Sequence, residues 1–166
     1  MPSRLSPIAA VLALGSLALS GPAWAGEEMV SYKSGEETVS GLLVTPTGPG
    51  PHPAVIVIQE WWGLNDWVKD QARALGKEGY LALAVDLYRG KVADKQEDAH
   101  QLMMGAPPAR IQRDLRAAFA WLSARKDVKA GKIGSIGWCM GGRWTRARAT
   151  EEPKLAAAVA YYGAPP

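Results

Sequence analysis

The residue types best suited to chemistry surround the single cysteine of the chain. Gly137, Cys139 and Gly141 form a glycine–x–cysteine–x–glycine pattern between an apolar stretch predicted as a strand and a segment predicted as a helix. A nucleophile in such a pattern occupies a tight strand-to-helix turn, which raises its reactive atom above the carboxyl edge of the sheet. Small residues are needed on both sides because larger ones would clash with the neighbouring strand and helix. The pattern predicts that Cys139 is a nucleophile.

The turn also brings hydrogen-bond donors to the predicted nucleophile. The start of the following helix and the amide of Met140 favour a thiolate and stabilise an oxyanion. A lone cysteine forms neither an internal disulfide nor a cysteine-rich metal site, so its role is either reactivity or packing. The alternative to a nucleophile is therefore a glycine-rich turn around a buried structural cysteine. The flanking strand and the additional Gly142 favour the nucleophile.

A second group of candidates follows the apolar stretch 54–58, which is predicted as a buried strand. Glu60, Trp61 and Trp62 come directly after it, so they fall at the same carboxyl edge of the sheet, where such folds bind ligands. The Trp61 amide is a candidate second oxyanion donor, and the Glu60 carboxylate can hydrogen-bond a thiol. Taken singly, a solvated loop carboxylate and two core tryptophans explain these residues better than a catalytic role does.

The remaining pattern supplies the elements that must position these groups. Strands are predicted over 29–33, 36–45, 54–58, 81–85, 132–137 and 156–162, and helices over 65–79, 93–104, 111–122 and from Met140 onward. Strands that alternate with helices indicate an α/β fold with a mostly parallel sheet flanked by helices. The first two strands form a hairpin that extends the sheet antiparallel at one edge. In the first long helix, Trp67, Val68, Ala72, Ala74 and Leu75 are expected on the apolar side.

Taken together, these motifs resemble the dienelactone hydrolase family (carboxymethylenebutenolidases) of the α/β-hydrolases. The resemblance rests on residues 59–65 (QEWWGLN), 79–89 (GYLALAVDLYR), 137–142 (GWCMGG) and 158–163 (AVAYYG). It implies hydrolysis of small esters or lactones, without a metal or organic cofactor. It also implies roles for individual residues: Cys139 as nucleophile, Glu60 as the carboxylate that activates the thiol, the amides of Trp61 and Met140 as oxyanion donors, Arg89 as partner of a substrate carboxylate, and Trp62 in the binding pocket.

Members of this family complete a Cys-His-Asp triad with residues that follow the Tyr-Tyr-Gly strand, whereas this sequence ends three residues after Gly163. His52 precedes a strand and so falls at the opposite edge of the sheet, and His100 is expected on a solvated helix face. We therefore expect residues 26–166 to form an α/β-hydrolase domain that is incomplete at its C-terminus and impaired in hydrolysis. A non-catalytic ligand-binding remnant, a thiol-redox protein and a non-functional gene fragment are the alternatives.

The helix after the cysteine is unusually basic for one that packs on a sheet. Arg143, Arg146 and Arg148 follow Gly142, with Trp144 among them. Either these side chains extend outward to solvent, or the sequence is locally corrupted. The sequence alone leaves both interpretations open.

Composition and the N-terminus set the remaining limits. The length of 166 residues fits one domain, and 48% hydrophobic and 21% charged residues exclude a disordered chain. With a net charge of +3 and no basic block, nucleic acid is not an expected partner. Arg4, an apolar run over 8–19 and Ala23-Trp24-Ala25 predict a signal peptide over 1–25, hence export to the periplasm or beyond and no membrane attachment after cleavage. The run is shorter than the ~20 residues of a membrane span. The oligomeric state is left open.

Overall fold

The computed structural model describes residues 24–163. They form β1 (Trp24–Ser34), β2 (Glu37–Pro46), β3 (His52–Ile58), α1 (Asp66–Lys77), β4 (Leu81–Val85), α2 (Gln96–Met104), α3 (Pro108–Ser123), β5 (Val128–Trp138), α4 (Met140–Glu151) and β6 (Ala157–Tyr161). Every predicted strand and helix is present among them, with shifted ends.

The strands form one sheet in the order β1-β2-β4-β3-β5-β6. The neighbours β4, β3, β5 and β6 run parallel, while β2 pairs antiparallel with both β1 and β4. Gly35 closes the β1–β2 hairpin with a φ of +60°, a conformation that tight hairpin turns require and glycine adopts without strain. The predicted parallel sheet with an antiparallel hairpin at one edge is confirmed.

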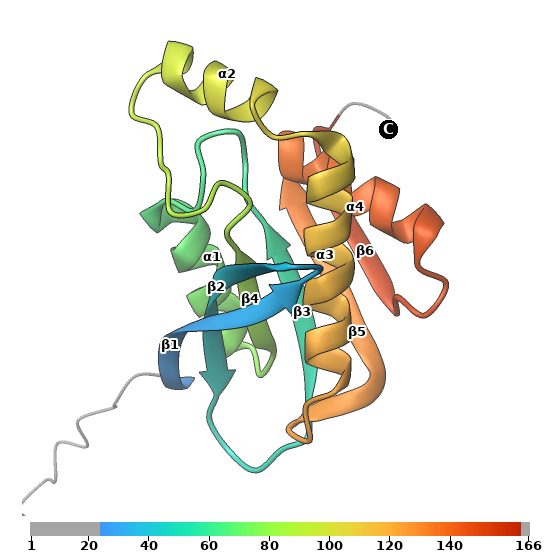
Figure 1. Ribbon diagram of the computed structural model, residues 1–166. Helices are drawn as coiled ribbons and strands as arrows, with labels where there is room; N and C mark the ends of the chain where they lie inside the picture. The colour runs from blue at the N-terminus through green and yellow to red at the C-terminus, as the bar shows by residue number, and fades with distance from the viewer. Residues whose placement is uncertain (1–23, 164–166) are drawn as a thin grey trace, which may run out of the picture.

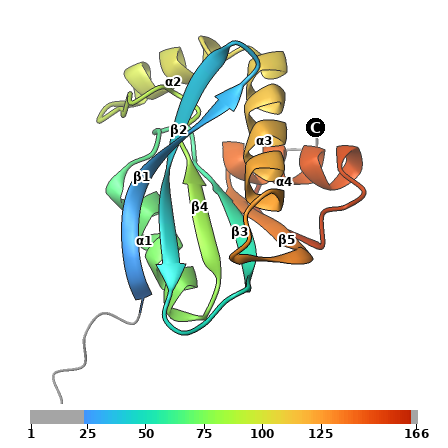
Figure 2. The same cartoon turned by 60° about the horizontal axis from the view of Figure 1, so that its bottom comes forward.

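Helices cover both faces of this sheet, as Figures 1 and 2 show. α3 and α4 pack on one face and α1 on the other, so each central strand buries both sets of alternating side chains. In β3, Ile56 and Ile58 face the α3–α4 layer, while Val57 faces α1. This two-sided burial explains why the central strands are continuously apolar instead of alternating.

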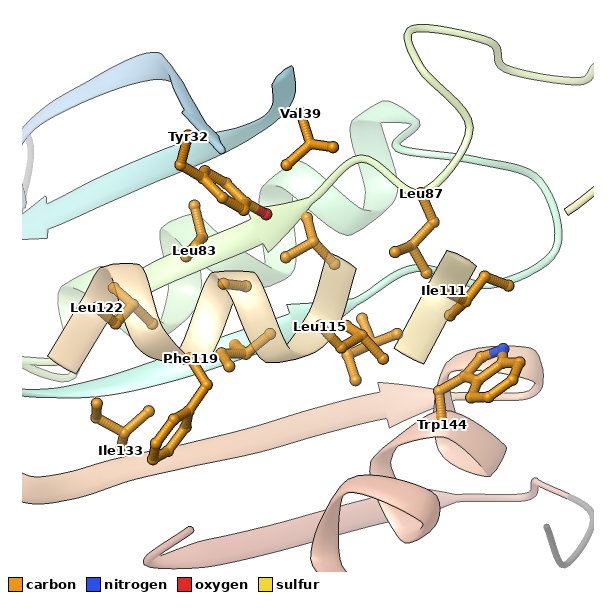
Figure 3. Close-up of a cluster of buried hydrophobic side chains, with 14 of the residues drawn as sticks. Tyr32, Val39, Leu83, Leu87, Ile111, Leu115, Phe119, Leu122, Ile133 and Trp144 are labelled. Carbon is orange, nitrogen blue, oxygen red and sulfur yellow. The ribbon is translucent and has the colours of Figure 1, made fainter. Parts of the chain in front are cut away.

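The larger core lies between the sheet and α3, as the close-up in Figure 3 shows. Residues four apart on α3 point toward the strands, because helical periodicity places them on one face. The α3 residues of this core are Ile111, Leu115, Ala118, Phe119 and Leu122. Trp144 of α4 extends the same core toward the end of the sheet where Cys139 lies.

Several predicted helix ends, and part of the predicted buried face of α1, are wrong. α1 ends at Lys77, two residues before the expected Gly79, and its Trp67 and Ala74 are exposed where burial was expected. The Trp67 ring instead packs edge-on against Trp138 at 5.0 Å. α2 begins at Gln96 because the preceding segment is held in an extended arrangement, in which Ala93 N–H donates to the Trp62 carbonyl at 2.9 Å.

The predicted signal peptide falls almost entirely outside the described residues. Only its last two positions, Trp24 and Ala25, are described, and they begin β1. Within residues 24–163, no helix has the length and apolar character of a membrane span.

Candidate active site

Cys139 occupies the turn between β5 and α4. Its φ of +54° and ψ of −117° are strained for a residue with a side chain. Hydrogen bonds hold this conformation on both sides: the Cys139 N–H donates to the Tyr161 carbonyl at 3.1 Å, and the Arg143 N–H donates to the Cys139 carbonyl at 3.1 Å. The half-buried thiol therefore stands at the N-terminus of α4, where free backbone N–H groups favour negative charge.

Three glycines make this turn possible because other chain segments approach them closely. A Cβ atom on Gly137 would lie 2.8 Å from Thr145 Oγ1, and one on Gly141 would lie 2.7 Å from the Gln59 carbonyl oxygen. A Cβ atom on Gly142 would lie 2.5 Å from the Tyr161 carbonyl oxygen. Atoms at such distances overlap, so any larger residue would displace a strand or α4. This is the crowding that the spacing of the glycines predicts.

A cavity of about 520 Å³ opens beside the thiol. It lies between the turn, the loop after β3 and the connection from α2 to α3, at the end of the sheet that Figure 1 shows beneath α2. Its walls are mostly apolar, and its lining residues are Trp61, Met103, Met104, Ala106, Pro108, Ile111, Cys139, Met140, Arg143, Trp144 and Tyr162. A small, mainly apolar molecule fits such a cavity.

Glu60 reaches this site through Tyr162. The Tyr162 hydroxyl donates a hydrogen bond to Glu60 Oε1 at 3.1 Å, and the Tyr162 side chain lines the cavity. Partial desolvation, followed by the negative charge of Glu60, raises the pKa of Tyr162, so this hydroxyl is a donor at neutral pH. Sequence reasoning missed Tyr162 as a site residue, although its place directly after β6, at the carboxyl edge of the sheet, is a signal for it.

The two predicted oxyanion donors come from two different segments beside the cavity. Met140 is the first residue of α4, and Trp61 belongs to the loop after β3; both line the cavity. The Tyr88 hydroxyl donates a hydrogen bond to Met140 Sδ at 3.2 Å, which fixes the position of the Met140 side chain. Burial, reinforced by the neighbouring Cys139, raises the pKa of Tyr88 to about 12, so Tyr88 keeps its proton in the neutral range.

Two predicted binding residues are not brought into the cavity. Arg89 Nη2 forms ion pairs with Glu37 Oε2 at 2.6 Å and with Asp114 Oδ2 at 2.7 Å. These carboxylates hold the Arg89 guanidinium through Nη2, and Arg89 lines a different hollow from Cys139. The Trp62 ring packs edge-on against the Trp61 ring at 5.2 Å and does not line the cavity.

The basic stretch of α4 divides by burial. Arg143 is exposed and lines the cavity, and Arg146 is half-buried. Arg148 is 1% exposed, so the interpretation that all three extend to solvent is wrong. Its guanidinium pairs with Glu152 Oε2 at 3.3 Å and Glu151 Oε2 at 3.7 Å, which compensates part of the cost of burying the charge.

Neither histidine of the sequence lies at the thiol. His52 begins β3 and pairs in register with Val128, whereas the last pair of the two strands, Ile58 with Gly137, adjoins the turn. His52 is thus at the opposite edge of the sheet, as expected. His100 is exposed on α2 and does not line the cavity.

Comparison with known proteins agrees with this geometry. Residues 39–166 match the model of the dienelactone hydrolase family. The chain belongs to the dienelactone hydrolase family. It is 33% identical over 144 residues to a protein of Methylorubrum extorquens named "Putative carboxymethylenebutenolidase", covering 84% of this chain and 49% of that protein. With an Escherichia coli protein of the same name, it is 38% identical over 119 residues, covering 69% of this chain and 44% of the relative.

The fold agrees with that of a dienelactone hydrolase relative of known structure. The crystal structure of a "Putative Dienelactone Hydrolase" from Klebsiella pneumoniae superimposes with a TM-score of 0.75 at 35% identity, covering 82% of this chain and 59% of that one. The described residues therefore have the α/β-hydrolase fold that the sequence predicts. The chain spans about half the length of the curated dienelactone hydrolase relatives it matches.

Proposed function

We propose that this protein acts on small esters or lactones through Cys139. The observation that carries the proposal is the strained turn that presents Cys139 to an apolar cavity in a dienelactone hydrolase fold. The cavity supplies room for a small acyl compound, and the turn supplies a sulfur at a helix N-terminus. Together they favour nucleophilic acyl transfer.

The first step is attack of the Cys139 sulfur on the substrate carbonyl carbon, as the thiol proton passes to Glu60. A carbon–sulfur bond forms, and the carbonyl π electrons move to oxygen, where the amides of Met140 and Trp61 donate hydrogen bonds to the oxyanion. The tetrahedral intermediate then collapses, the carbon–oxygen bond to the leaving group breaks, and the leaving alcohol or opened ring takes up a proton. The product of this half-reaction is a thioester on Cys139.

Glu60 is the group that we assign to thiol activation. Its carboxylate accepts a hydrogen bond from Tyr162, a cavity-lining residue, which restricts where the second carboxylate oxygen points. From the loop after β3 that oxygen can accept the proton of the Cys139 thiol as sulfur attacks. Glu60 then returns the proton to the leaving group.

The second half-reaction is hydrolysis of the thioester, which needs a base to take a proton from water. His52 lies at the far edge of the sheet and His100 is exposed on α2. Glu60 is then the base that we assign near the thiol, and because neither histidine is placed to assist it, we propose that this chain acylates faster than it deacylates, so that turnover is impaired and the acyl-enzyme accumulates.

The test is rapid mixing of the full chain with p-nitrophenyl acetate, with Cys139→Ala and Cys139→Ser as matched variants. We expect a burst of p-nitrophenolate of up to one equivalent per chain, then slow release, and no burst from Cys139→Ala. Sustained turnover that requires Cys139 would contradict the proposed slow deacylation. An undiminished burst from Cys139→Ala would rule out the nucleophile.

We also propose that the chain is exported, with cleavage near Ala25. Support comes from the composition of residues 1–25: a positive start, a short apolar run and small residues at the cleavage position. The check is fractionation of expressing cells with N-terminal sequencing. A periplasmic or secreted product that begins at Gly26 is expected, and an uncleaved cytoplasmic product would refute export.

A further inference from the structure

The cavity beside Cys139 holds one cation without a carboxylate partner. Among its lining residues Arg143 alone is basic. Within residues 24–163 no ion pair involves Arg143, and its guanidinium carbon lies 5.5 Å from the centroid of the Trp144 ring. Its side chain is exposed at the cavity.

Several other arginines of this part of the chain are paired with carboxylates, whereas no ion pair of the described residues involves Arg110 or Arg146. Arg89 and Arg113 share Glu37 and Asp114, and Arg148 pairs with Glu151 and Glu152. Glu60, the carboxylate on the loop after β3, is engaged by the Tyr162 hydroxyl. Arg143 thus keeps its full hydrogen-bonding capacity, with a planar set of donors that suits a carboxylate.

Arg143 is also close to the thiol along α4. Its N–H donates to the Cys139 carbonyl at 3.1 Å, so its backbone lies about one helical turn beyond that of the cysteine, and both residues line the same cavity. A small compound in that cavity can place its carbonyl at the sulfur and an anionic group of the same carbon skeleton at the guanidinium. The apolar walls, among them Ile111 and Trp144, contact the carbon skeleton between them.

We propose that Arg143 is the specificity-determining residue of this site and selects acyl compounds that carry a second, anionic group. This assignment rests on the proposed function in one respect, that Cys139 is the reacting atom. In this assignment Arg143 binds the anionic group of the substrate. Arg89, the residue expected from the sequence to do so, is paired with Glu37 and Asp114 instead.

The test uses two alkylating reagents that differ in charge, iodoacetate and iodoacetamide. In both, the thiolate attacks the methylene carbon, a carbon–sulfur bond forms and iodide leaves. The ratio of the two rate constants on the full chain reports anion preference independently of ester turnover. The matched variants are Arg143→Gln, Arg143→Lys and Arg146→Gln; Arg146 lies on the same helix but not in the cavity.

We expect Arg143→Gln to lower the iodoacetate-to-iodoacetamide ratio roughly fivefold, the scale of an exposed ion pair. Arg143→Lys should retain most of the preference, and Arg146→Gln should leave the ratio unchanged. Added salt should lower the wild-type ratio, because screening weakens the attraction. Equal ratios for wild type and Arg143→Gln, or equal losses in Arg143→Gln and Arg146→Gln, would overturn the inference.

Failure of the proposed function gives a different result. If Cys139 shows the Arg143-dependent reagent preference but no acyl group is transferred from esters, anion recognition stands and acyl transfer falls. If neither reagent labels Cys139, the thiol and Arg143 do not share an open cavity, and both proposals fall.

Discussion

The Tyr162 hydroxyl donates a hydrogen bond to Glu60 Oε1 at 3.1 Å, although 102 positions separate the two residues in the sequence. Glu60 follows β3 and Tyr162 follows β6, so the parallel sheet brings the two strand ends to one edge. Tyr162 adopts a φ of +34°, outside the backbone conformations that most residues with a side chain adopt. The bond couples the loop of the predicted activating carboxylate to the wall of the cavity.

Removing this bond tests whether it positions Glu60. Tyr162→Phe keeps the ring but loses the donor, and we expect Cys139 acylation to slow about fivefold, corresponding to about 1 kcal/mol for the lost hydrogen bond. Tyr161→Phe is the matched control, since the Tyr161 ring stacks on Trp138 on another part of the surface. A positioning role also predicts a changed pH profile of Cys139 alkylation in Tyr162→Phe. Profiles and acylation rates equal to those of wild type would exclude it.

The turn around Cys139 should not accept a methyl group at Gly141. The new Cβ would overlap the carbonyl oxygens of Ile58 and Gln59, which are backbone atoms in a central strand and its loop. We expect Gly141→Ala to lower the free energy of unfolding by about 3 kcal/mol, measured by urea denaturation. Gly26→Ala is the control, because a Cβ there meets nothing within 4 Å. A Gly141→Ala midpoint within error of the control would show that the turn is not crowded.

Asp114 is expected to be the most costly carboxylate to neutralise. It is 2% exposed, accepts a 2.5 Å hydrogen bond from Ser34 Oγ and pairs with Arg89. Asp114→Asn leaves the Arg89 charge without its buried partner, and we expect a loss of about 3 kcal/mol. Asp70→Asn removes an exposed pair with Arg73 and should cost less than about 1 kcal/mol. Chemical denaturation of both variants measures the loss in free energy of unfolding. Equal losses for Asp114→Asn and Asp70→Asn would contradict the burial of the Asp114 carboxylate.

Tyr88 gives the protein a defined alkaline sensitivity. Burial raises its pKa from an ordinary 10.0 to about 12, so the folded state favours the neutral phenol more than the unfolded state does. The resulting stability is complete below pH 10 and is lost as the pH rises toward 12, by at most about 1.4 kcal/mol per pH unit. Tyr88→Phe should reduce the slope of unfolding free energy against pH in that range. Identical slopes for variant and wild type would show that Tyr88 does not titrate differently on folding.

Local pattern was sufficient to predict most of the fold. The central strands are apolar on both faces because α1, α3 and α4 cover both sides of the sheet, and such stretches are recognisable in a single sequence. The turn at Cys139 was predictable for a similar reason, because crowding by Ile58, Gln59 and Tyr161 leaves room only for glycine at fixed positions.

The unpredicted features depend on pairs that are distant in sequence. Arg89 resembles a free ligand-binding arginine until the fold brings Glu37 and Asp114 to it. Arg148 is charged and follows other arginines, yet α4 packs so that it is buried. The position of Tyr162 after a strand marks it as a site candidate, but its bond to Glu60 and the open guanidinium of Arg143 have no local signature, because each is defined by which partners the fold supplies.

The central claim is that Cys139 accepts the acyl group of an ester. The most direct measurement is mass spectrometry of the full chain quenched shortly after mixing with p-nitrophenyl acetate, followed by peptide mapping. We predict one acetyl group per chain, on the peptide that contains Cys139, and none on that peptide in Cys139→Ala. Acetylation confined to lysines, or equal in wild type and Cys139→Ala, would contradict the claim.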